Sequence, residues 1–262
     1  MSTEIIFFDI DDTLCRLGRL TENNLRALQA LSAQNTVKLA IATGRSIAML
    51  PPDIRRLFDS GMIEVLVSAN GQYNMIGSEI VSHYPLDQAA AAELAAVCRR
   101  FGLVYQQLSE HHIAWSEPLP HYEQTKAVFP GCVIDPDYYS RHSIYQFSVF
   151  LPEQDEDPDI VRTFEDLGFH FARWHKGGAD LLPAQGSKAR GIADICAALG
   201  INPAHTMAFG DGLNDIEMLQ YVGIGVAMGN AWEALKAVAD YVTATLEDDG
   251  IERALRHFSV LK

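Results

Sequence analysis

The chain of 262 residues has no long hydrophobic run and few basic side chains. Its apolar stretches are far shorter than the roughly 18 residues that a membrane-spanning helix needs, and its first residues lack the basic start of a secretory signal. Acidic residues number 34 against 20 basic ones, for a formal net charge of −14. This charge disfavours a nucleic acid or an anionic membrane as partner. We therefore expect a cytoplasmic protein with neither of these partners.

Cysteine is also scarce, and the four cysteines stand far apart at Cys15, Cys98, Cys132 and Cys196. None of them forms the close pair that is typical of a structural zinc site or a redox dithiol. We expect four reduced, mostly buried thiols. With 48% hydrophobic and 21% charged residues, the chain can bury a sizeable core, and nothing in it indicates an obligate protein partner.

Short apolar runs alternate with longer segments of helical period, a pattern typical of a parallel sheet flanked by helices. A helix capped by Thr21 carries Leu25, Leu28 and Leu31 on one stripe. Later helices are expected at 187–199, 214–222 and 231–239. The predicted strands cover residues 5–8, 37–42, 64–68, 206–210 and 224–227.

Residues 82–182 interrupt this alternation with aromatic and histidine-rich stretches. They contain two helix candidates, 86–101 and 159–167, and alternating strand candidates such as 145–150. Pro85 and Pro183 lie near the two crossings. We predict an α/β protein with a Rossmann-like parallel-sheet core made of residues 1–81 and 183–262, and an inserted α+β cap domain at 82–182.

Carboxylates follow the first predicted strand, in Asp9-Ile10-Asp11-Asp12-Thr13. The carboxyl ends of parallel strands are where open α/β sheets bind ligands, although such a cluster alone is often only an acidic turn. Thr43-Gly44-Arg45 follows the second strand, and Gly210-Asp211-Gly212-Leu213-Asn214-Asp215 follows a later one. If these strands are neighbours, their carboxylates converge.

Converging carboxylates repel one another unless a cation compensates them. Magnesium is the natural candidate, because it takes hard oxygen ligands and keeps room for water and a substrate phosphate. Lys188, at a predicted helix start, would add a fixed positive charge. Its alternative interpretation is an ordinary surface lysine.

Taken in order, the motifs resemble the haloacid dehalogenase (HAD) superfamily, and specifically its Cof-like phosphatases of subclass IIB. The predicted cap follows the second of these motifs, which contains Thr43-Gly44-Arg45, as it does in that group. Ser68-Ala69-Asn70-Gly71 and Ala227-Met228-Gly229-Asn230-Ala231 extend the resemblance. The four main motifs are Phe8-Asp9-Ile10-Asp11-Asp12-Thr13, Ala42-Thr43-Gly44-Arg45, Lys188 and Gly210-Asp211-Gly212-Leu213-Asn214-Asp215.

The resemblance implies a role for each carboxylate of the first motif. Asp9 would attack phosphorus and form an aspartyl-phosphate. Asp11 would protonate the leaving alcohol and then take a proton from water. The side chains of Asp9 and Asp211, with the backbone carbonyl of Asp11, would bind Mg²⁺.

It also implies which residues surround the phosphate. Thr43, Gly44, Lys188 and Asn214 would hold its non-bridging oxygens. Behind them, Thr13 would fix Asp11 by a hydrogen bond, and Asp215 would orient Lys188 or a metal-bound water rather than bind the ion.

Other polar residues leave alternatives open. Asp12 is read as a turn residue, because the family often has glycine there. Arg45 reaches toward the leaving group or pairs with a neighbouring acid. Asn70, Arg173 and His175 are possible substrate contacts, and the patch around the last two could equally be an ordinary strand surface.

The resulting hypothesis is a magnesium-dependent phosphohydrolase that cleaves a small phosphomonoester, such as a sugar phosphate, through an aspartyl-phosphate. A phosphomutase or phosphotransferase on the same fold is the alternative. A metal-dependent binding module without catalysis is disfavoured, because Asp9 and Asp11 are both present.

Overall fold

The computed structural model describes residues 3–262, apart from the side chains of Trp174 and His175. It divides into two compact units. The core unit comprises the chain up to residue 44 together with 51–82 and 187–262, and the cap unit comprises 45–50 and 83–186. The segment 45–50, which the sequence-based boundaries left in the core, thus groups with the cap unit.

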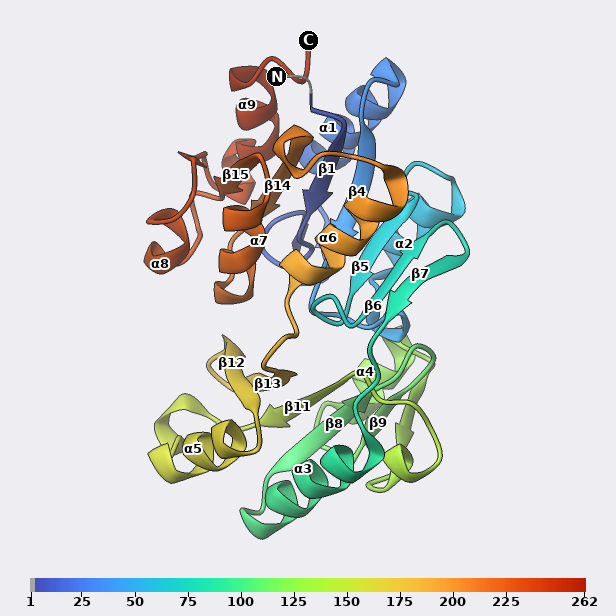
Figure 1. Ribbon diagram of the computed structural model, residues 1–262, viewed down its shortest axis with the longest axis vertical. Helices are drawn as coiled ribbons and strands as arrows, with labels where there is room; N and C mark the ends of the chain where they lie inside the picture. The colour runs from blue at the N-terminus through green and yellow to red at the C-terminus, as the bar shows by residue number, and fades with distance from the viewer. Residues whose placement is uncertain (1–2) are drawn as a thin grey trace. The chain divides into compact units, whose positions relative to one another are not determined.

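Within the described residues, the core sheet has eight strands in the order β16-β15-β14-β1-β4-β5-β6-β7 (Figure 1). The pairs from β16 to β5 are parallel, and β6 runs antiparallel to β5. The predicted parallel α/β core is confirmed. The strands are β1 (Ile5–Phe8), β4 (Lys38–Ala42), β5 (Val65–Ser68), β6 (Tyr73–Ile76), β7 (Glu79–His83), β14 (Thr206–Gly210), β15 (Ile224–Ala227) and β16 (Tyr241–Val242).

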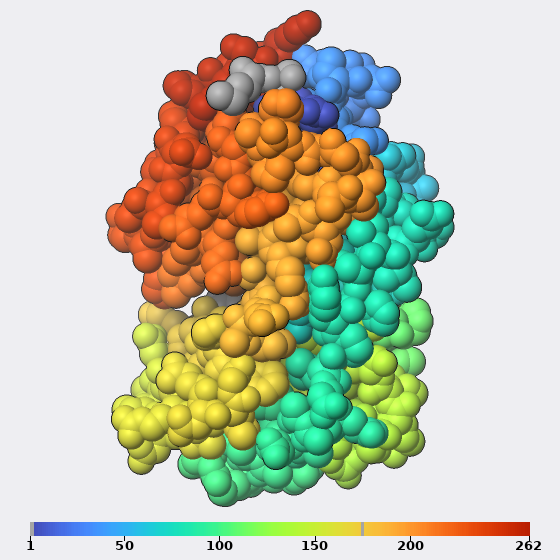
Figure 2. Space-filling model, viewed as in Figure 1, coloured from blue at the N-terminus to red at the C-terminus, as the bar shows by residue number. Residues whose placement is uncertain are grey.

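Helices cover both faces of the core sheet. On one face, α6 contacts β5 and β6 while α7 contacts β14 and β15, and both helices belong to the part of the chain coloured orange in Figure 2. On the other face, α1 contacts β4 and α9. Thr21 caps α1 as predicted, accepting from the backbone N–H of Asn24 at 3.3 Å. The helices are α1 (Glu22–Gln34), α2 (Pro52–Asp59), α6 (Lys188–Leu199), α7 (Ile216–Tyr221), α8 (Glu233–Lys236) and α9 (Gly250–His257).

The cap unit has its own sheet and its own core. Six strands are described, in the order β10-β9-β8-β11-β13-β12. One apolar cluster joins α3 and α5 to this sheet through residues such as Leu94, Phe147 and Phe164. The elements are α3 (Gln88–Arg100), β8 (Val104–Leu108), β9 (Ile113–Trp115), α4 (Tyr122–Val128), β10 (Cys132–Ile134), β11 (Gln146–Phe150), α5 (Pro158–Asp166), β12 (Phe169–His175) and β13 (Gly178–Pro183).

Two expectations from composition can be compared with the structure. The four cysteines are buried and free, as predicted. Between residues 3 and 262, no helix combines the length and apolarity needed to cross a bilayer.

Candidate active site

Three polar segments meet at the carboxyl ends of adjacent strands. β1 lies between β4 and β14 in the core sheet, so Asp9, Thr43 and Asp211 each follow a strand at the same edge. The backbone N–H of Asp9 bonds the carbonyl of Phe209 at 3.0 Å. The predicted convergence of the motifs therefore follows from the strand order.

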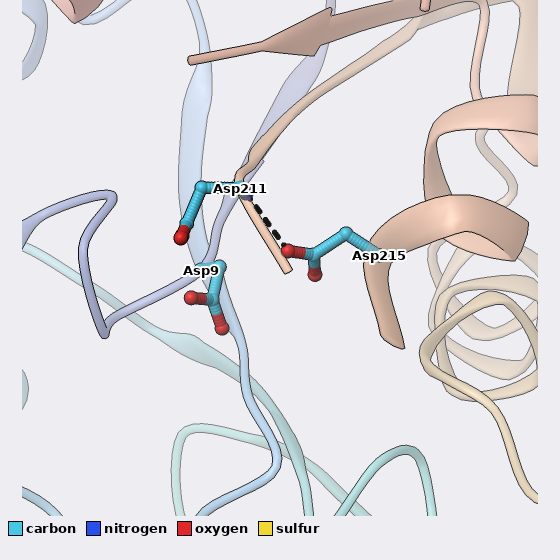
Figure 3. Close-up of side chains that lie close together, drawn as sticks. All are labelled: Asp9, Asp211 and Asp215. Carbon is cyan, nitrogen blue, oxygen red and sulfur yellow. Dashed lines mark hydrogen bonds between the residues drawn. The ribbon is translucent and has the colours of Figure 1, made fainter. Parts of the chain in front are cut away.

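A carboxylate cluster forms at this edge. One carboxylate oxygen from each of Asp9, Asp211 and Asp215 lies within 4.8 Å of the other two (Figure 3). Lys188, the first residue of α6, is fully buried, and its Nζ donates to Asp9 Oδ1 at 2.6 Å and to Asp215 Oδ1 at 2.5 Å. The surface alternative for Lys188 is thus excluded, and the ammonium group is an integral part of the cluster.

Burial and mutual repulsion dominate the electrostatics of the cluster. Burial raises the pKa of Asp9 to about 7, although the Lys188 charge acts in the opposite direction. Burial, and then the Asp9 charge, raise the pKa of Asp211 to about 8. For Lys188, burial alone lowers the pKa, but Asp215 and Asp9 outweigh it and raise the pKa above its ordinary value. A further cation would therefore fit beside Asp9 and Asp211, because carboxylate oxygens are the ligands that hard divalent ions prefer.

Asp215 belongs to this group by distance, but its oxygens have other partners. Oδ1 accepts from Lys188, while Oδ2 accepts from the backbone N–H groups of Asp211 at 3.0 Å and Gly212 at 2.9 Å. The expected orienting role toward Lys188 agrees with these contacts. Gly210 gives it room, since a Cβ there would lie 2.5 Å from the Asp215 carboxyl group.

Thr13 requires a correction. The sequence predicted a hydrogen bond from Thr13 to Asp11, but the Thr13 hydroxyl donates to Asp211 Oδ1 at 2.8 Å. The exposed Asp11 lies in a bridge with Cys15 instead. The chain turns at this point, and the buried Thr13 meets the neighbouring strand end, which no local pattern indicates.

Asp12 is a turn residue, as predicted. Its φ is +54°, and its backbone N–H bonds the carbonyl of Cys15 at 2.8 Å. Its carboxylate accepts from Arg16 at 2.7 Å, and Arg16 belongs to the hairpin of β2 (Cys15–Arg16) and β3 (Arg19–Leu20). The left-handed conformation explains why glycine suits this position.

The expected phosphate-binding residues other than Lys188 lie side by side. A Cβ on Gly44 would lie 3.1 Å from Asn70 Nδ2 and 3.5 Å from Asn214 Nδ2. Asn214 also donates to Asn70 Oδ1 at 3.0 Å. Thr43, which precedes Gly44, is buried.

The remaining candidates lie in the cap unit. Arg45 donates to the carbonyl of Met49 at 3.0 Å and lies over the ring of Phe129. Arg173 donates from Nε to Glu156 at 3.0 Å and from Nη1 to the carbonyl of Leu151 at 3.0 Å. The side chain of His175 lies outside the described part of the structure.

Sequence reasoning gave no role to two asparagines that support the loop after β1. Buried Asn24 on α1 donates to the carbonyls of Thr13 and Leu14, both at 3.0 Å. Asn230 donates to the carbonyl of Asp12 at 2.9 Å. Asn24 could have been noticed because it is a polar residue beside the apolar stripe of α1. Asn230 could have been noticed because it lies in the Met228-Gly229-Asn230 part of a motif that resembles the family.

Comparison with known proteins places this geometry in a family. The sequence matches the haloacid dehalogenase-like hydrolases over residues 6–255. The chain belongs to this family. YkrA, a candidate phosphatase of Bacillus subtilis (strain 168), is 33% identical over the full length of both proteins. The predicted membership of the HAD-like hydrolases is therefore confirmed.

Solved structures extend the HAD similarity to the whole fold. The subclass IIB sugar phosphatase BT4131 matches with a TM-score of 0.87 and 32% identity, covering 98% of this chain and 100% of that one. A protein from Geobacillus kaustophilus HTA426 matches with a TM-score of 0.81 and 36% identity, over 99% and 100% of the two chains. The predicted HAD fold with a separate cap sheet is thereby confirmed.

Proposed function

We propose that the protein is a magnesium-dependent phosphohydrolase of small phosphomonoesters that works through an aspartyl-phosphate. The observation that carries this proposal is the Asp9 carboxylate at a strand end, 2.6 Å from the buried ammonium of Lys188 and beside Asp211. The similarity of the protein to the sugar phosphatase BT4131 supports a sugar phosphate as substrate.

In the proposed reaction, a carboxylate oxygen of Asp9 attacks phosphorus and the bond to the alcohol oxygen breaks. Asp11 gives its proton to that oxygen, so the alcohol leaves neutral. Water then attacks the phosphorus of the aspartyl-phosphate and passes a proton to Asp11. This step frees Asp9 and inorganic phosphate.

Charge compensation divides between the protein and the metal. Lys188 and the Asn214 amide would hold the non-bridging phosphate oxygens, whose charge grows in the transition state. Asp9, Asp211 and the backbone carbonyl of Asp11 would hold Mg²⁺. When bound, Mg²⁺ would offset the negative charge of the carboxylates and the phosphoryl group.

The cap, predicted at 82–182, is proposed to select the leaving group. Its separate sheet and apolar cluster support a role distinct from the chemistry of the core unit. Arg45, Arg173 and His175 stay candidate substrate contacts.

The test is a phosphate-release screen over several dozen metabolites with and without magnesium. Hydrolysis that needs magnesium and favours sugar phosphates is the expected result. Interconversion of sugar phosphates with little free phosphate would establish a mutase instead. Asp9→Asn should abolish turnover and keep the fold, because an amide cannot attack phosphorus. Asp59→Asn, the same change at an exposed position on α2, is the matched control and should keep full activity.

A further inference from the structure

We propose that Asn70 is a positioning residue that sets the orientation of the Asn214 amide for phosphate binding. This inference rests on the proposed function and adds a residue to its phosphate site. It differs from the direct substrate contact that the sequence suggested for Asn70.

The backbone around Asn70 has an uncommon conformation. Ala69, Asn70 and Gly71 have φ values of +48°, +51° and +80°. Two successive non-glycine residues in the left-handed region cost free energy, and such conformations persist where the surrounding structure holds them. Here Asn74 Nδ2 donates to the carbonyl of Gly71 at 3.0 Å, from a buried position on β6.

This conformation turns the Asn70 side chain toward two phosphate-binding segments. Its backbone N–H bonds the carbonyl of Thr43 at 3.0 Å, and its amide lies against Gly44. Its Oδ1 accepts from Asn214 Nδ2 at 3.0 Å. Asn70 is 1% exposed, so its amide is confined among these groups.

The bond to Asn70 determines which way the Asn214 amide faces. A primary amide carries two N–H donors. Because one of them is directed at Asn70 Oδ1, rotation of the Asn214 amide alone would break this hydrogen bond. The second N–H of Asn214 is the donor that we assign to a phosphate oxygen.

The same loop also reaches the third phosphate-binding segment. A Cβ on Gly71 would lie 2.1 Å from the carbonyl oxygen of Ser187, the N-cap of α6. The next residue is Lys188. The loop 69–71 thus contacts the segments that carry Thr43, Asn214 and Lys188, which is why we assign it a positioning role.

A double-mutant cycle tests the proposal. Asn70→Gly removes the amide and keeps the backbone, because glycine adopts a φ of +51° without strain. Kinetics with a hydrolysed phosphomonoester and inhibition by inorganic phosphate are measured for Asn70→Gly, Asn214→Ala and the double variant. Each single change should weaken phosphate binding about 10- to 100-fold, as loss of a hydrogen bond to a charged group does. The double variant should be within about twofold of Asn214→Ala.

Asn24→Ala provides the matched control, since Asn24 is also 1% exposed but bonds the carbonyls of Thr13 and Leu14. Its effect should add to that of Asn214→Ala. Thermal melts identify any destabilised variant, and the whole cycle is then measured at a temperature below its melting transition.

Additive effects of Asn70→Gly and Asn214→Ala in an active enzyme would overturn the positioning role. A wild-type protein that neither hydrolyses phosphomonoesters nor binds phosphate would overturn the proposed function as well.

Discussion

Replacing Lys188 by methionine leaves two buried carboxylates without their cationic partner. The Lys188 and Asp215 side chains are fully buried, and Asp9 is 7% exposed. Removing one member of a buried ion pair costs about 3–5 kcal/mol, because the remaining charge stays uncompensated in a medium of low polarity. For a domain of about 150–250 residues, this corresponds to a decrease in Tm of about 6–20 °C.

Activity should fall for a separate reason. Without the ammonium group, the phosphate oxygens lose a hydrogen-bond donor that stabilises their charge in the transition state. Loss of one such donor reduces kcat by about 10²–10³. Removal of Lys188 also removes an interaction that lowers the pKa of Asp9. A larger share of the nucleophile would then be protonated at neutral pH.

The double variant Lys188→Met/Asp215→Asn separates stability from activity. It removes one uncompensated charge while keeping the shape of the site, so it should recover part of the lost Tm and stay inactive. Thermal melts followed by circular dichroism in a chelator, with turnover assayed separately in magnesium, provide both readouts. Lys38→Met is the control, because Lys38 is half exposed and lies 4.0 Å from Glu64. An unchanged Tm for Lys188→Met, or a double variant less stable than Lys188→Met, would refute this reasoning.

The titration of the carboxylate cluster, the acid role of Asp11 and the buried thiols can each be tested. Burial raises the pKa of Asp9 to about 7 and of Asp211 to about 8, so the folded chain binds more protons than the unfolded one. Measured in a chelator, the free energy of unfolding should therefore fall as the pH rises from about 4 to about 8. Melts that show a flat or rising profile would contradict this, and magnesium should raise Tm more at pH 8 than at pH 5. Asp11→Asn should reduce turnover of a sugar phosphate more than that of para-nitrophenyl phosphate, whose leaving group needs little protonation, and equal losses would count against the acid role. Burial raises the pKa of Cys98 to about 12 and of Cys196 to about 11, so a disulfide reagent should titrate these thiols only after denaturation; rapid reaction of the native protein would show that they are accessible.

The sequence alone determined five strands of the core unit, β1, β4, β5, β14 and β15, and the polar residues that follow three of them. Hydrophobic period and caps are local properties, so the bounds of β1 and the N-cap of α1, Thr21, were predicted correctly. Asp9, Thr43 and Asp211 were identifiable because each follows an apolar strand. Parallel strands bring such residues to one edge whenever the strands are neighbours.

Only the tertiary structure decided which side chain bonds which. The Thr13 hydroxyl meets Asp211 on the neighbouring strand end, although Asp11 is nearer in sequence. Asn70 and Asn214 are separated by 144 positions and still share a hydrogen bond. Such partners depend on strand order and on loop conformations that no periodic pattern encodes.

The assignment of residues 45–50 to a unit also depended on the tertiary structure. Residues 45–50 follow a core strand directly, and composition gave no reason to separate them from it. Yet Ala48 packs with Trp115 and Leu108 in an apolar cluster of the cap unit. Burial of these side chains depends on surfaces that exist only after the cap sheet has formed, so long-range packing assigns this segment to the cap unit.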